Sequence, residues 1–444
     1  MKLEICTVGG YNEVGKNMTA IKYGKEAVIF DMGLHMEKYI DWHEDNLDMK
    51  PTAKELEKED AIPDDRFIKD WRGMVKVIVP THAHLDHVGA IPYMSNRYDA
   101  PIVCTPYTAE VIKAIIKDDK FKLNNSIKVM NANSTYKISD NLTLEFINVT
   151  HSTPQTVMAA LHTPEGIVLY ANDFKFDNFP TLGKKPNFKR LSELGEKGIK
   201  LLIVDGTRAT REGKTPSESV AKEMLRDVLI ATESKGKIVV VTTFSSHLAR
   251  LKTIVEFGRK MNREVIFMGR SLAKYVEAGE AIGIVNFSDE VEILKYSRQV
   301  RKKLKQINRD RREKYLLVMT GHQGEPGAVL SRILHHELAF DFEPDDHVVF
   351  SCSVIPNPTN IANRQLLENK LKKAKVRIFK DIHTSGHASK EDLRDLINMV
   401  KPEHIIPAHG DFTMTSALSD LAVDMGYRLG HNVHIMRNGQ RLEL

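Results

Sequence analysis

An H-x-H-x-D-H run from His82 to His87 is the densest group of potential metal ligands in the sequence. It directly follows Val75–Val79, an apolar run of the length expected for a strand. Three imidazoles and a carboxylate within six residues would be costly to bury without an ion to satisfy them. This mixture of nitrogen and oxygen donors suits zinc, or manganese as a metal that accepts harder ligands. We expect His82 and His84 to face one ion, and Asp86 and His87 to face a second.

Other histidines and aspartates stand where strand-like segments end. Six such segments each end within about two residues of one of these side chains, which are Asp31, His82, His151, Asp173, Asp205 and His409. In open α/β sheets, ligands gather beyond the carboxyl ends of the strands, where loops turn side chains toward one crevice. Residues more than 200 positions apart in the chain are therefore expected to converge on one site.

The elements expected to carry these residues alternate between strands and helices. Short apolar runs recur between helix-length segments, and residues 142–149 alternate loosely, as a half-buried strand does. The expected strands include Val75–Val79, Ile167–Ala171, Lys200–Val204, Ile238–Val241, Val265–Met268, Tyr315–Met319, Val348–Phe350, Val376–Phe379 and His404–Ile406. The sequence shows no internal repeat and no low-complexity tract. This pattern predicts an α/β protein.

The ordered set of ligand candidates resembles the signature of the metallo-β-lactamase superfamily. After the H-x-H-x-D-H run come His151, then Asp173, and finally His409. Two positions depart from the usual pattern: Asn172 replaces a glycine before Asp173, and Gln155 stands where an acid often follows the His151 motif. Neither position is a metal ligand in that pattern.

The resemblance implies two metal sites that share Asp173 as a bridging ligand. One ion would be bound by His82, His84 and His151, and the other by Asp86, His87 and His409. Asp31 would orient a ligand imidazole or the metal-bound water. Two zinc ions per chain, or manganese in their place, are thus the expected cofactors, and Asp86 and Asp31 are expected to belong to the catalytic machinery.

A long insertion separates the last two ligand candidates. Asp173 and His409 are 236 residues apart, which leaves room for a whole domain. The insertion resembles the β-CASP domain of nucleic-acid-processing nucleases, whose additional motifs match Asp205 and His387. The resemblance implies that Asp205 supports a ligand histidine, and that His387 stabilises the scissile phosphate and protonates the leaving oxygen.

Finer motifs resemble the ribonuclease J group over nearly the whole chain. They are D-G-T at 205–207, T-P-S-E at 215–218, M-G-R-S at 268–271, T-G-H-Q-G-E-P at 320–326 and H-T-S-G-H-A-S at 383–389. We therefore expect an αββα metallo-β-lactamase sandwich at 1–208 and 377–444, with an inserted α/β β-CASP domain at 209–376. Because the chain ends soon after His409, we expect the shorter archaeal form, without the C-terminal domain of bacterial members.

The resemblance implies a 5′→3′ exonuclease on single-stranded RNA that prefers 5′-monophosphate ends and hydrolyses phosphodiesters with a hydroxide held between two metals. Binding a 5′-phosphate requires hydroxyl, amide and guanidinium donors. The candidates are Ser245, Ser246 and His247, together with Arg270 and Ser271. His383 and Ser385 are expected to contact the phosphate near the cut, together with His387. The serines equally suit the N-cap of a helix expected at 247–261, and helix N-termini themselves bind phosphate.

Composition excludes several other classes. The 444 residues include 42% hydrophobic and 28% charged side chains, far from disordered or collagen-like compositions. Three scattered cysteines form no disulfide framework, and neither a signal peptide nor a membrane span is evident, so a cytoplasmic protein is expected. The net charge of +5 only weakly favours a polyanionic partner.

Charge is unevenly distributed. Residues 295–314 contain ten basic and two acidic side chains, and fit either a path for RNA backbone or a solvated helix face. Residues 37–65 contain eleven acidic side chains and four lysines, and belong to an apparent insertion at 37–73. RNA contact is not expected at that acidic insertion.

Three alternatives remain open at this point. A β-CASP endoribonuclease of the cleavage-and-polyadenylation type would cut internally, but the resemblance to its archaeal members would imply additional N-terminal RNA-binding domains, which we do not expect here. A non-catalytic RNA-binding subunit is disfavoured because every ligand position is filled, and a small-molecule hydrolase is disfavoured by the long insertion. The sequence leaves open the formation of a homodimer, the identity of partners in an RNA-degradation complex, and the balance of exonuclease and endonuclease activity.

Overall fold

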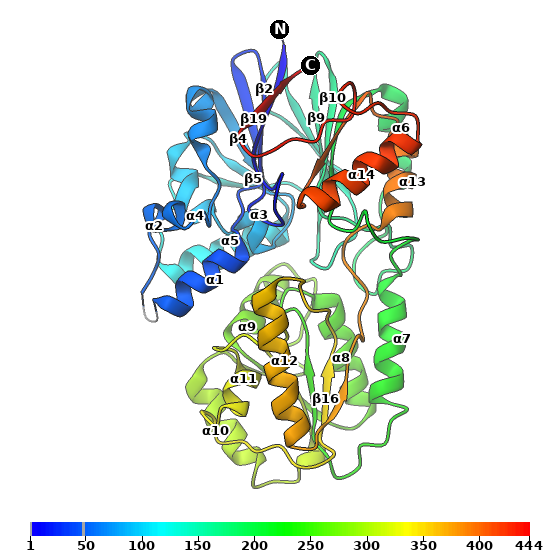
Figure 1. Ribbon diagram of the computed structural model, residues 1–444. Helices are drawn as coiled ribbons and strands as arrows, with labels where there is room; N and C mark the ends of the chain where they lie inside the picture. Colours follow the sequence, from blue (N-terminus) through cyan, green and yellow to red (C-terminus); the bar gives the residue numbers. More distant parts are fainter. Residues whose placement is uncertain (1, 47–48) are drawn as a thin grey trace. The chain divides into compact units, whose positions relative to one another are not determined.

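The computed structural model describes residues 2–46 and 49–444 and divides into two compact units (Figure 1). Unit 1 comprises residues 1–178, 184–215 and 386–444, and unit 2 comprises residues 179–183 and 216–385. The boundaries expected from sequence fell earlier, after residues 208 and 376. In the structure, Arg377–Phe379 (β17) pairs with a strand of unit 2, and the Thr215 hydroxyl donates to the carbonyl of His387 in unit 1.

Two mixed sheets form the centre of unit 1. The first has the order β19-β1-β2-β3-β4-β5-β6 and consists of Gln440–Glu443, Leu3–Gly9, Met18–Tyr23, Glu26–Phe30, Val75–Val79, Ile102–Cys104 and Ile127–Val129. The second has the order β18-β11-β10-β9-β8-β7 and consists of His404–Ala408, Ile199–Asp205, Gly166–Ala171, Val157–Thr163, Thr143–Asn148 and Thr135–Lys137. Strands from both ends of the chain meet in the first sheet, where β1 pairs antiparallel with β19.

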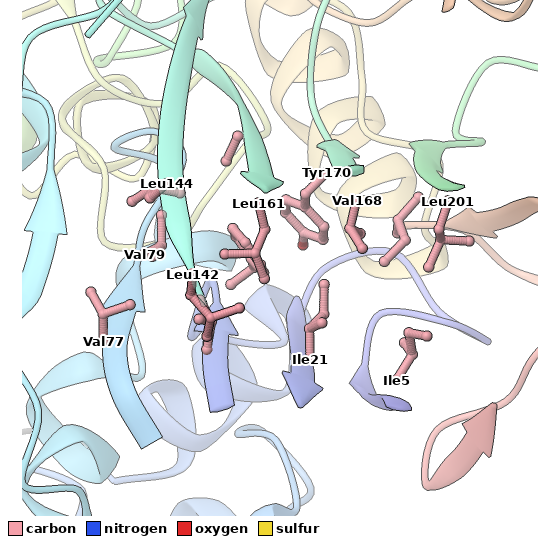
Figure 2. Close-up of a cluster of buried hydrophobic side chains, with 14 of the residues drawn as sticks. Ile5, Ile21, Val77, Val79, Leu142, Leu144, Leu161, Val168, Tyr170 and Leu201 are labelled. Carbon is pink, nitrogen blue, oxygen red and sulfur yellow. The ribbon is translucent and has the colours of Figure 1, made fainter. Parts of the chain in front are cut away.

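The two sheets face each other across one apolar core. Side chains of β1 to β4 meet those of β8 to β11, and Figure 2 shows Ile21, Val77, Leu161 and Tyr170 among them. The rings of Phe30 and Tyr170 stack across this interface with centroids 5.0 Å apart. Burial of alternate strand residues on both inner faces stabilises the sandwich.

Helices cover the outer faces of the sandwich (Figure 1). On the second sheet, a second apolar cluster packs it against α6 (Phe188–Lys197), α13 (Lys390–Val400) and α14 (Phe412–Asp424). The helices beside the first sheet are α1 (Met36–Asp45), α2 (Ala53–Lys58), α3 (Leu85–Val88), α4 (Ile91–Met94) and α5 (Pro106–Asp119). The expected αββα sandwich is therefore confirmed.

The acidic segment expected as an insertion, residues 37–73, contributes α1, α2 and a 3₁₀ segment, Asp65–Met74, while its residues 47 and 48 lie outside the described part. Several of its carboxylates have structural partners. The buried Asp65 accepts hydrogen bonds from Arg72, Arg97 and the hydroxyl of Tyr98. These acids thus attach the segment to the sandwich.

Unit 2 is a three-layer α/β unit around an all-parallel sheet. The sheet has the order β14-β13-β15-β12-β16-β17 and consists of Glu292–Leu294, Glu264–Met268, Tyr315–Met319, Val239–Thr242, His347–Phe350 and Arg377–Phe379. Its helices are α7 (Glu218–Leu229), α8 (Leu248–Lys260), α9 (Arg270–Ala281), α10 (Ser297–Ile307), α11 (Val329–Leu334) and α12 (Pro358–Lys373). Because all six strands are parallel, the loops that follow them lie at one edge of the sheet.

None of the described helices combines the length and apolarity needed to cross a bilayer.

Candidate metal centre and active site

Loops at the strand ends of unit 1 bring the expected ligands together. After β4 the chain turns into the short helix α3, which carries Asp86 and His87 and begins just after His84. Backbone hydrogen bonds fix this turn: the amide of Met32 donates to the carbonyl of His87, and the amide of Asn17 donates to that of Asp86. The ligand loop is therefore held by the loops that precede β2 and follow β3.

The first cluster contains His82, His84, His151 and Asp173, whose potential ligand atoms all lie within 4.8 Å of one another. Nδ1 of His84 lies 3.1 Å from Nε2 of His82 and 3.1 Å from Nε2 of His151. Nitrogens bound at zinc distances in a tetrahedral site are roughly 3.3 Å apart. The three imidazoles are thus spaced as ligands of one ion.

The second cluster contains Asp86, His87, His409 and Asp173. Nε2 of His87 and Nε2 of His409 each lie 3.7 Å from Oδ2 of Asp86. They lie 3.3 Å and 3.4 Å from Oδ1 of Asp173. The pairing of residues in the two clusters is the one that the sequence resemblance implied.

Asp173 faces both clusters with different oxygens. Its Oδ2 lies 3.5 Å from His82 Nε2 and 3.3 Å from His151 Nε2, whereas Oδ1 faces the second cluster. Oδ1 is buried and has no hydrogen-bond donor among the described residues. A buried carboxylate oxygen surrounded by ring nitrogens, without a donor, fits a position beside a divalent cation.

Hydrogen bonds on the far side of the rings orient the imidazoles. His87 donates from Nδ1 to Asp31 at 2.8 Å, and His151 donates from Nδ1 to the carbonyl of Gly386 at 2.7 Å. Because Nδ1 donates in each case, Nε2 is the nitrogen left to bind a metal beside Asp173. Asp31 is itself fixed by two hydrogen bonds from Thr81, through the amide and the hydroxyl.

Two further contacts were not anticipated from the sequence. Nδ1 of His82 lies 3.2 Å from the Thr81 hydroxyl. Nδ1 of His409 lies 3.0 Å from Oδ1 and 2.8 Å from Nδ2 of Asn17. Asn17 also receives a hydrogen bond from Asn172, at the position that departs from the superfamily pattern. The only sequence signal for Asn17 was its place in a loop with glycines at 10 and 15, both with positive φ.

His387 and Asp205 form a pair beside the first cluster. Nδ1 of His387 donates to Asp205 at 2.8 Å, and Nε2 lies 3.9 Å from Oδ2 of Asp173. The Thr207 amide donates to the other oxygen of Asp205, Oδ1. Asp205 therefore contacts His387, whereas the sequence resemblance had implied a ligand histidine as its partner.

Burial and charge set the protonation of the site. Burial lowers the pKa of His82, and it lowers the pKa values of His84 and His151 well below the ordinary value. These rings are therefore neutral near pH 7, as metal ligands must be. Burial would raise the pKa of Asp173, but the imidazoles of His409 and His87 hold it well below its usual range.

The carboxylates act in the opposite sense on two other histidines. Burial alone would lower the pKa of His87, but Asp173 and Asp31 hold it well above the ordinary value. Burial likewise opposes a charge on His387, yet Asp173 and Asp205 raise its pKa to about 9. The carboxylates of the cluster thus attract positive charge, whether as protons or as metal ions.

Apart from His387, which belongs to unit 1, the predicted phosphate contacts lie in unit 2, at the carboxyl edge of its sheet. Ser245 and Ser246 follow β12, Arg270 and Ser271 begin α9, and the loop of His383 and Ser385 follows β17. Since these strands are parallel, the six residues share one edge.

The expected role of the serines as helix caps is wrong. His247 occupies the N-cap of α8, and its Nδ1 accepts a hydrogen bond from the amide of Arg250. An imidazole nitrogen thus replaces the serine oxygen usually found there. The ring of Phe244 lies edge-to-face with that of His322 and tilted to that of His383, with centroids 4.5 Å and 6.0 Å away.

Comparisons with known proteins agree with this architecture. Residues 11–242 match the family model of the metallo-β-lactamase superfamily, residues 235–369 match the ribonuclease J β-CASP domain, and residues 373–436 match the Zn-dependent metallo-hydrolase RNA specificity domain. A protein of unknown function from Enterococcus faecalis has a similar fold, with a TM-score of 0.65, 15% identity and full coverage of both chains. Fold and site thus define a metallo-β-lactamase superfamily protein with a β-CASP insertion.

Curated relatives narrow the assignment. The chain is 46% identical to ribonuclease J of Methanocaldococcus jannaschii, over 100% of this chain and 99% of the relative. It is 46% identical to ribonuclease J of Pyrococcus abyssi, over 100% of this chain and 97% of the relative. Ribonuclease J 1 of Streptococcus pyogenes is 30% identical, and the match covers 99% of this chain and 74% of that protein. The chain belongs to the ribonuclease J family, and as a member of the metallo-β-lactamase superfamily it binds divalent metal.

Proposed function

We propose that this chain is a two-metal ribonuclease that degrades single-stranded RNA from the 5′ end and prefers a 5′-monophosphate. Its cofactors are two zinc ions, or manganese in their place. The observation that carries the proposal is the position of Asp173 between two separate sets of ligand atoms, one facing each of its carboxylate oxygens. The kinship with proteins named ribonuclease J supports RNA as the substrate.

We assign the ligands as the two clusters group them. His82, His84 and His151 hold one ion, Asp86, His87 and His409 hold the other, and Asp173 joins them. Two such ions supply a water of lowered pKa and stabilise the attacking and leaving oxygens of an in-line displacement. Asp31 positions His87 by accepting its Nδ1 proton.

His387 is the group that we assign to the leaving oxygen. Asp205 accepts the Nδ1 proton of His387, which favours the protonated ring and holds Nε2 toward Asp173. A protonated Nε2 donates to a phosphate oxygen and then releases its proton to the alkoxide that departs. Asp205 acts through His387 as the group that fixes its orientation.

Recognition of the 5′ end is assigned to the carboxyl edge of the unit 2 sheet. Arg270 and Ser271 are exposed at the first turn of α9, and Ser245 is half-buried after β12. Guanidinium and hydroxyl donors at a helix start suit a phosphate monoester. His383 and Ser385 are assigned to phosphates farther along the RNA, and His387 to the phosphate that is cut.

The direction of degradation is tested with one single-stranded RNA labelled at its 3′ end. Versions with a 5′-monophosphate, a 5′-triphosphate and a 5′-hydroxyl are compared with zinc or manganese supplied. We expect products that shorten progressively from the 5′ end, fastest for the monophosphate. Discrete internal cuts that are indifferent to the 5′ group would instead establish the endoribonuclease of the cleavage-and-polyadenylation type.

The division of roles is tested with two histidine variants. His84→Ala removes a ligand, so metal content and cleavage should fall together. His387→Ala leaves both ligand clusters intact, so metal content should stay at the wild-type level while cleavage slows roughly 10²- to 10⁴-fold, the usual contribution of general acid catalysis. Equal loss of metal in both variants would contradict the assignment.

We further propose a cytoplasmic enzyme whose macromolecular partner is RNA. Formation of a homodimer is a separate hypothesis, which sedimentation analysis of the metal-loaded protein tests directly.

A further inference from the structure

The outer face of helix α10 in unit 2 carries an uninterrupted group of positive charges. Arg298, Arg301, Lys302 and Lys305 occupy positions i, i+3, i+4 and i+7, and all four are exposed. At 3.6 residues per turn these positions fall within an arc of about 100° and span about 10 Å along the axis. Val300, Leu304 and Ile307 are buried on the opposite face.

The basic residues around this helix fall into two groups. Lys303 is directed toward Glu264 and Glu292, Lys295 pairs with Glu277, and Arg312 contacts Asp346. These cations have structural partners. Among the described residues, no ion pair is formed by any member of the second group, which consists of Arg298, Arg301, Lys302, Lys305 and, just beyond the helix, Arg309.

Helix stability does not explain this arrangement. The eleven residues of α10 include five basic and no acidic side chains, whereas α7, α8, α9 and α12 each mix both signs. Like charges three or four residues apart destabilise a helix. A helix face whose positive charges repel one another, with no acidic side chain among them, is complementary to a polyanion.

An aromatic side chain stands at the start of this charged face. Tyr296 is the N-cap residue of α10 and is 58% exposed. Exposed aromatic rings beside a basic surface are the features by which proteins hold single-stranded nucleic acid, since bases stack on the ring while cations contact the backbone. Among the described residues, the combination of an exposed ring and unpaired cations on one helix therefore favours single-stranded nucleic acid as the occupant.

We propose that Tyr296 and the cations of α10 form an accessory surface that binds single-stranded RNA outside the metal centre. This proposal rests on RNA being the substrate of the enzyme. In it, Arg298, Arg301, Lys302, Lys305 and Arg309 contact phosphates, and the Tyr296 ring stacks on a base. The surface recognises backbone and base faces, so it discriminates single strands from duplexes and has little sequence preference.

The test measures binding of the metal-loaded full chain to a labelled single-stranded RNA with phosphorothioate linkages, which slow its cleavage. Fluorescence anisotropy is recorded over a series of KCl concentrations. The variant Arg301→Gln/Lys302→Gln/Lys305→Gln should lower the slope of log affinity against log salt by about 2, because each phosphate contact contributes about 0.7 for single strands. The matched variant Lys370→Gln/Lys372→Gln/Lys373→Gln removes three cations from α12 and should leave the slope unchanged.

Tyr296 supplies an independent readout. Tyr296→Ala should weaken binding of the single strand roughly 5- to 150-fold, the usual effect of losing one stacked base, while Tyr296→Phe keeps the wild-type affinity. Wild-type slopes in the α10 triple variant, or an equal loss in the α12 variant, would overturn the proposal. Unchanged affinity of Tyr296→Ala would overturn the assignment to single-stranded RNA. If the wild-type protein binds no RNA at all, the proposed function fails as well, so the two failures are distinguishable.

Discussion

A buried ion pair in unit 2 allows a quantitative prediction. Arg250 of α8 is fully buried, and its Nη2 donates to Oε2 of Glu218 at 2.9 Å. The guanidinium also donates to the carbonyls of Ser351 and Ile382, at 3.0 Å and 3.2 Å. The pair therefore ties α7, α8, the end of β16 and the loop of His383 together.

Arg250→Met removes every one of these donors while keeping an unbranched side chain of similar length. Burial would raise the pKa of Glu218, but His247 and Arg250 hold it well below the usual range. Removing one partner of a buried pair costs about 3–5 kcal/mol, because the other charge stays buried. For a unit of this size, 1 kcal/mol corresponds to about 2–4 °C. We expect the thermal transition of unit 2 to fall by roughly 6–20 °C.

Scanning calorimetry of the full chain measures this shift, with Arg259→Met as the matched control. Arg259 belongs to the same helix, but its pair with Glu290 is exposed, at 67% and 40% of the side-chain surfaces. An exposed pair contributes about 0–1 kcal/mol, so the control should shift by a few degrees at most. Glu218→Leu combined with Arg250→Met should recover part of the loss. Equal shifts for the two single arginine variants would refute the reasoning.

Two further predictions concern unit 1. A Cβ at Gly386 would lie 2.8 Å from Nδ1 of His151, which donates to the Gly386 carbonyl, so Gly386→Ala should lower metal affinity about 10- to 100-fold in a chelator competition. Gly73→Ala, where the added Cβ meets nothing within 4 Å, should bind metal normally, and equal losses would contradict the steric argument. Burial would raise the pKa of Glu145, but His162 and Arg190 lower it to about 2. The ionised Glu145 carboxylate therefore stabilises the folded state fully above the pKa of an unfolded glutamate, about 4.3, and this stabilisation is lost as the pH falls toward 2. Glu145→Gln should destabilise unit 1 by about 2–3 kcal/mol at neutral pH, and the difference in melting temperature should vanish near pH 2; a constant difference would exclude this linkage.

The metal ligands could be predicted because the local sequence shows that each of them lies at the end of a strand. His151, Asp173 and His409 each follow an apolar strand, and the three strands (β8, β10 and β18) run in the same direction, so their carboxyl ends meet at one edge of the sheet. The assignment of residues to two clusters came from the resemblance, and the structure groups them in the same way. Strands with strong apolar patterns, such as Tyr315–Met319, were likewise placed within a residue or two.

Residues whose role depends on long-range contacts could not be predicted. Arg250 has the pattern of an ordinary helix cation, and only the approach of Glu218, 32 positions away, makes its burial possible. The short strands Ile127–Val129 and Thr135–Lys137 have three residues each and are mostly exposed, so neither apolar length nor alternation marks them. Packing against neighbours, rather than local propensity, forms such elements.

Asn17 is the site residue with the least sequence signal, and its contacts lead to a specific prediction. Nε2 of His409 faces Asp86 and Asp173, so a metal bound there requires the proton on Nδ1. The acceptor for that proton is Oδ1 of Asn17, 3.0 Å away. Nδ2 of Asn17 lies 2.8 Å from the same ring nitrogen and donates to the carbonyl of Asp86. The Gly15 amide also points at Nδ1, from 3.3 Å, and as a donor it favours the opposite tautomer. Asn17 therefore supplies the acceptor that the metal-binding tautomer of His409 requires.

Asn17→Ala should consequently weaken one ion and spare the other. The Gly15 amide then stabilises His409 with its proton on Nε2, and the affinity of the Asp86, His87 and His409 cluster should fall about 10- to 100-fold. The cluster of His82, His84 and His151 makes no hydrogen bond to Asn17 in the described structure and should keep its ion. Metal titration at limiting concentrations should therefore change from two equivalents to one. Asn12→Ala alters an exposed asparagine of the same loop and should retain both. Parallel loss of both ions from Asn17→Ala would show that Asn17 acts on the whole loop rather than on the tautomer of His409.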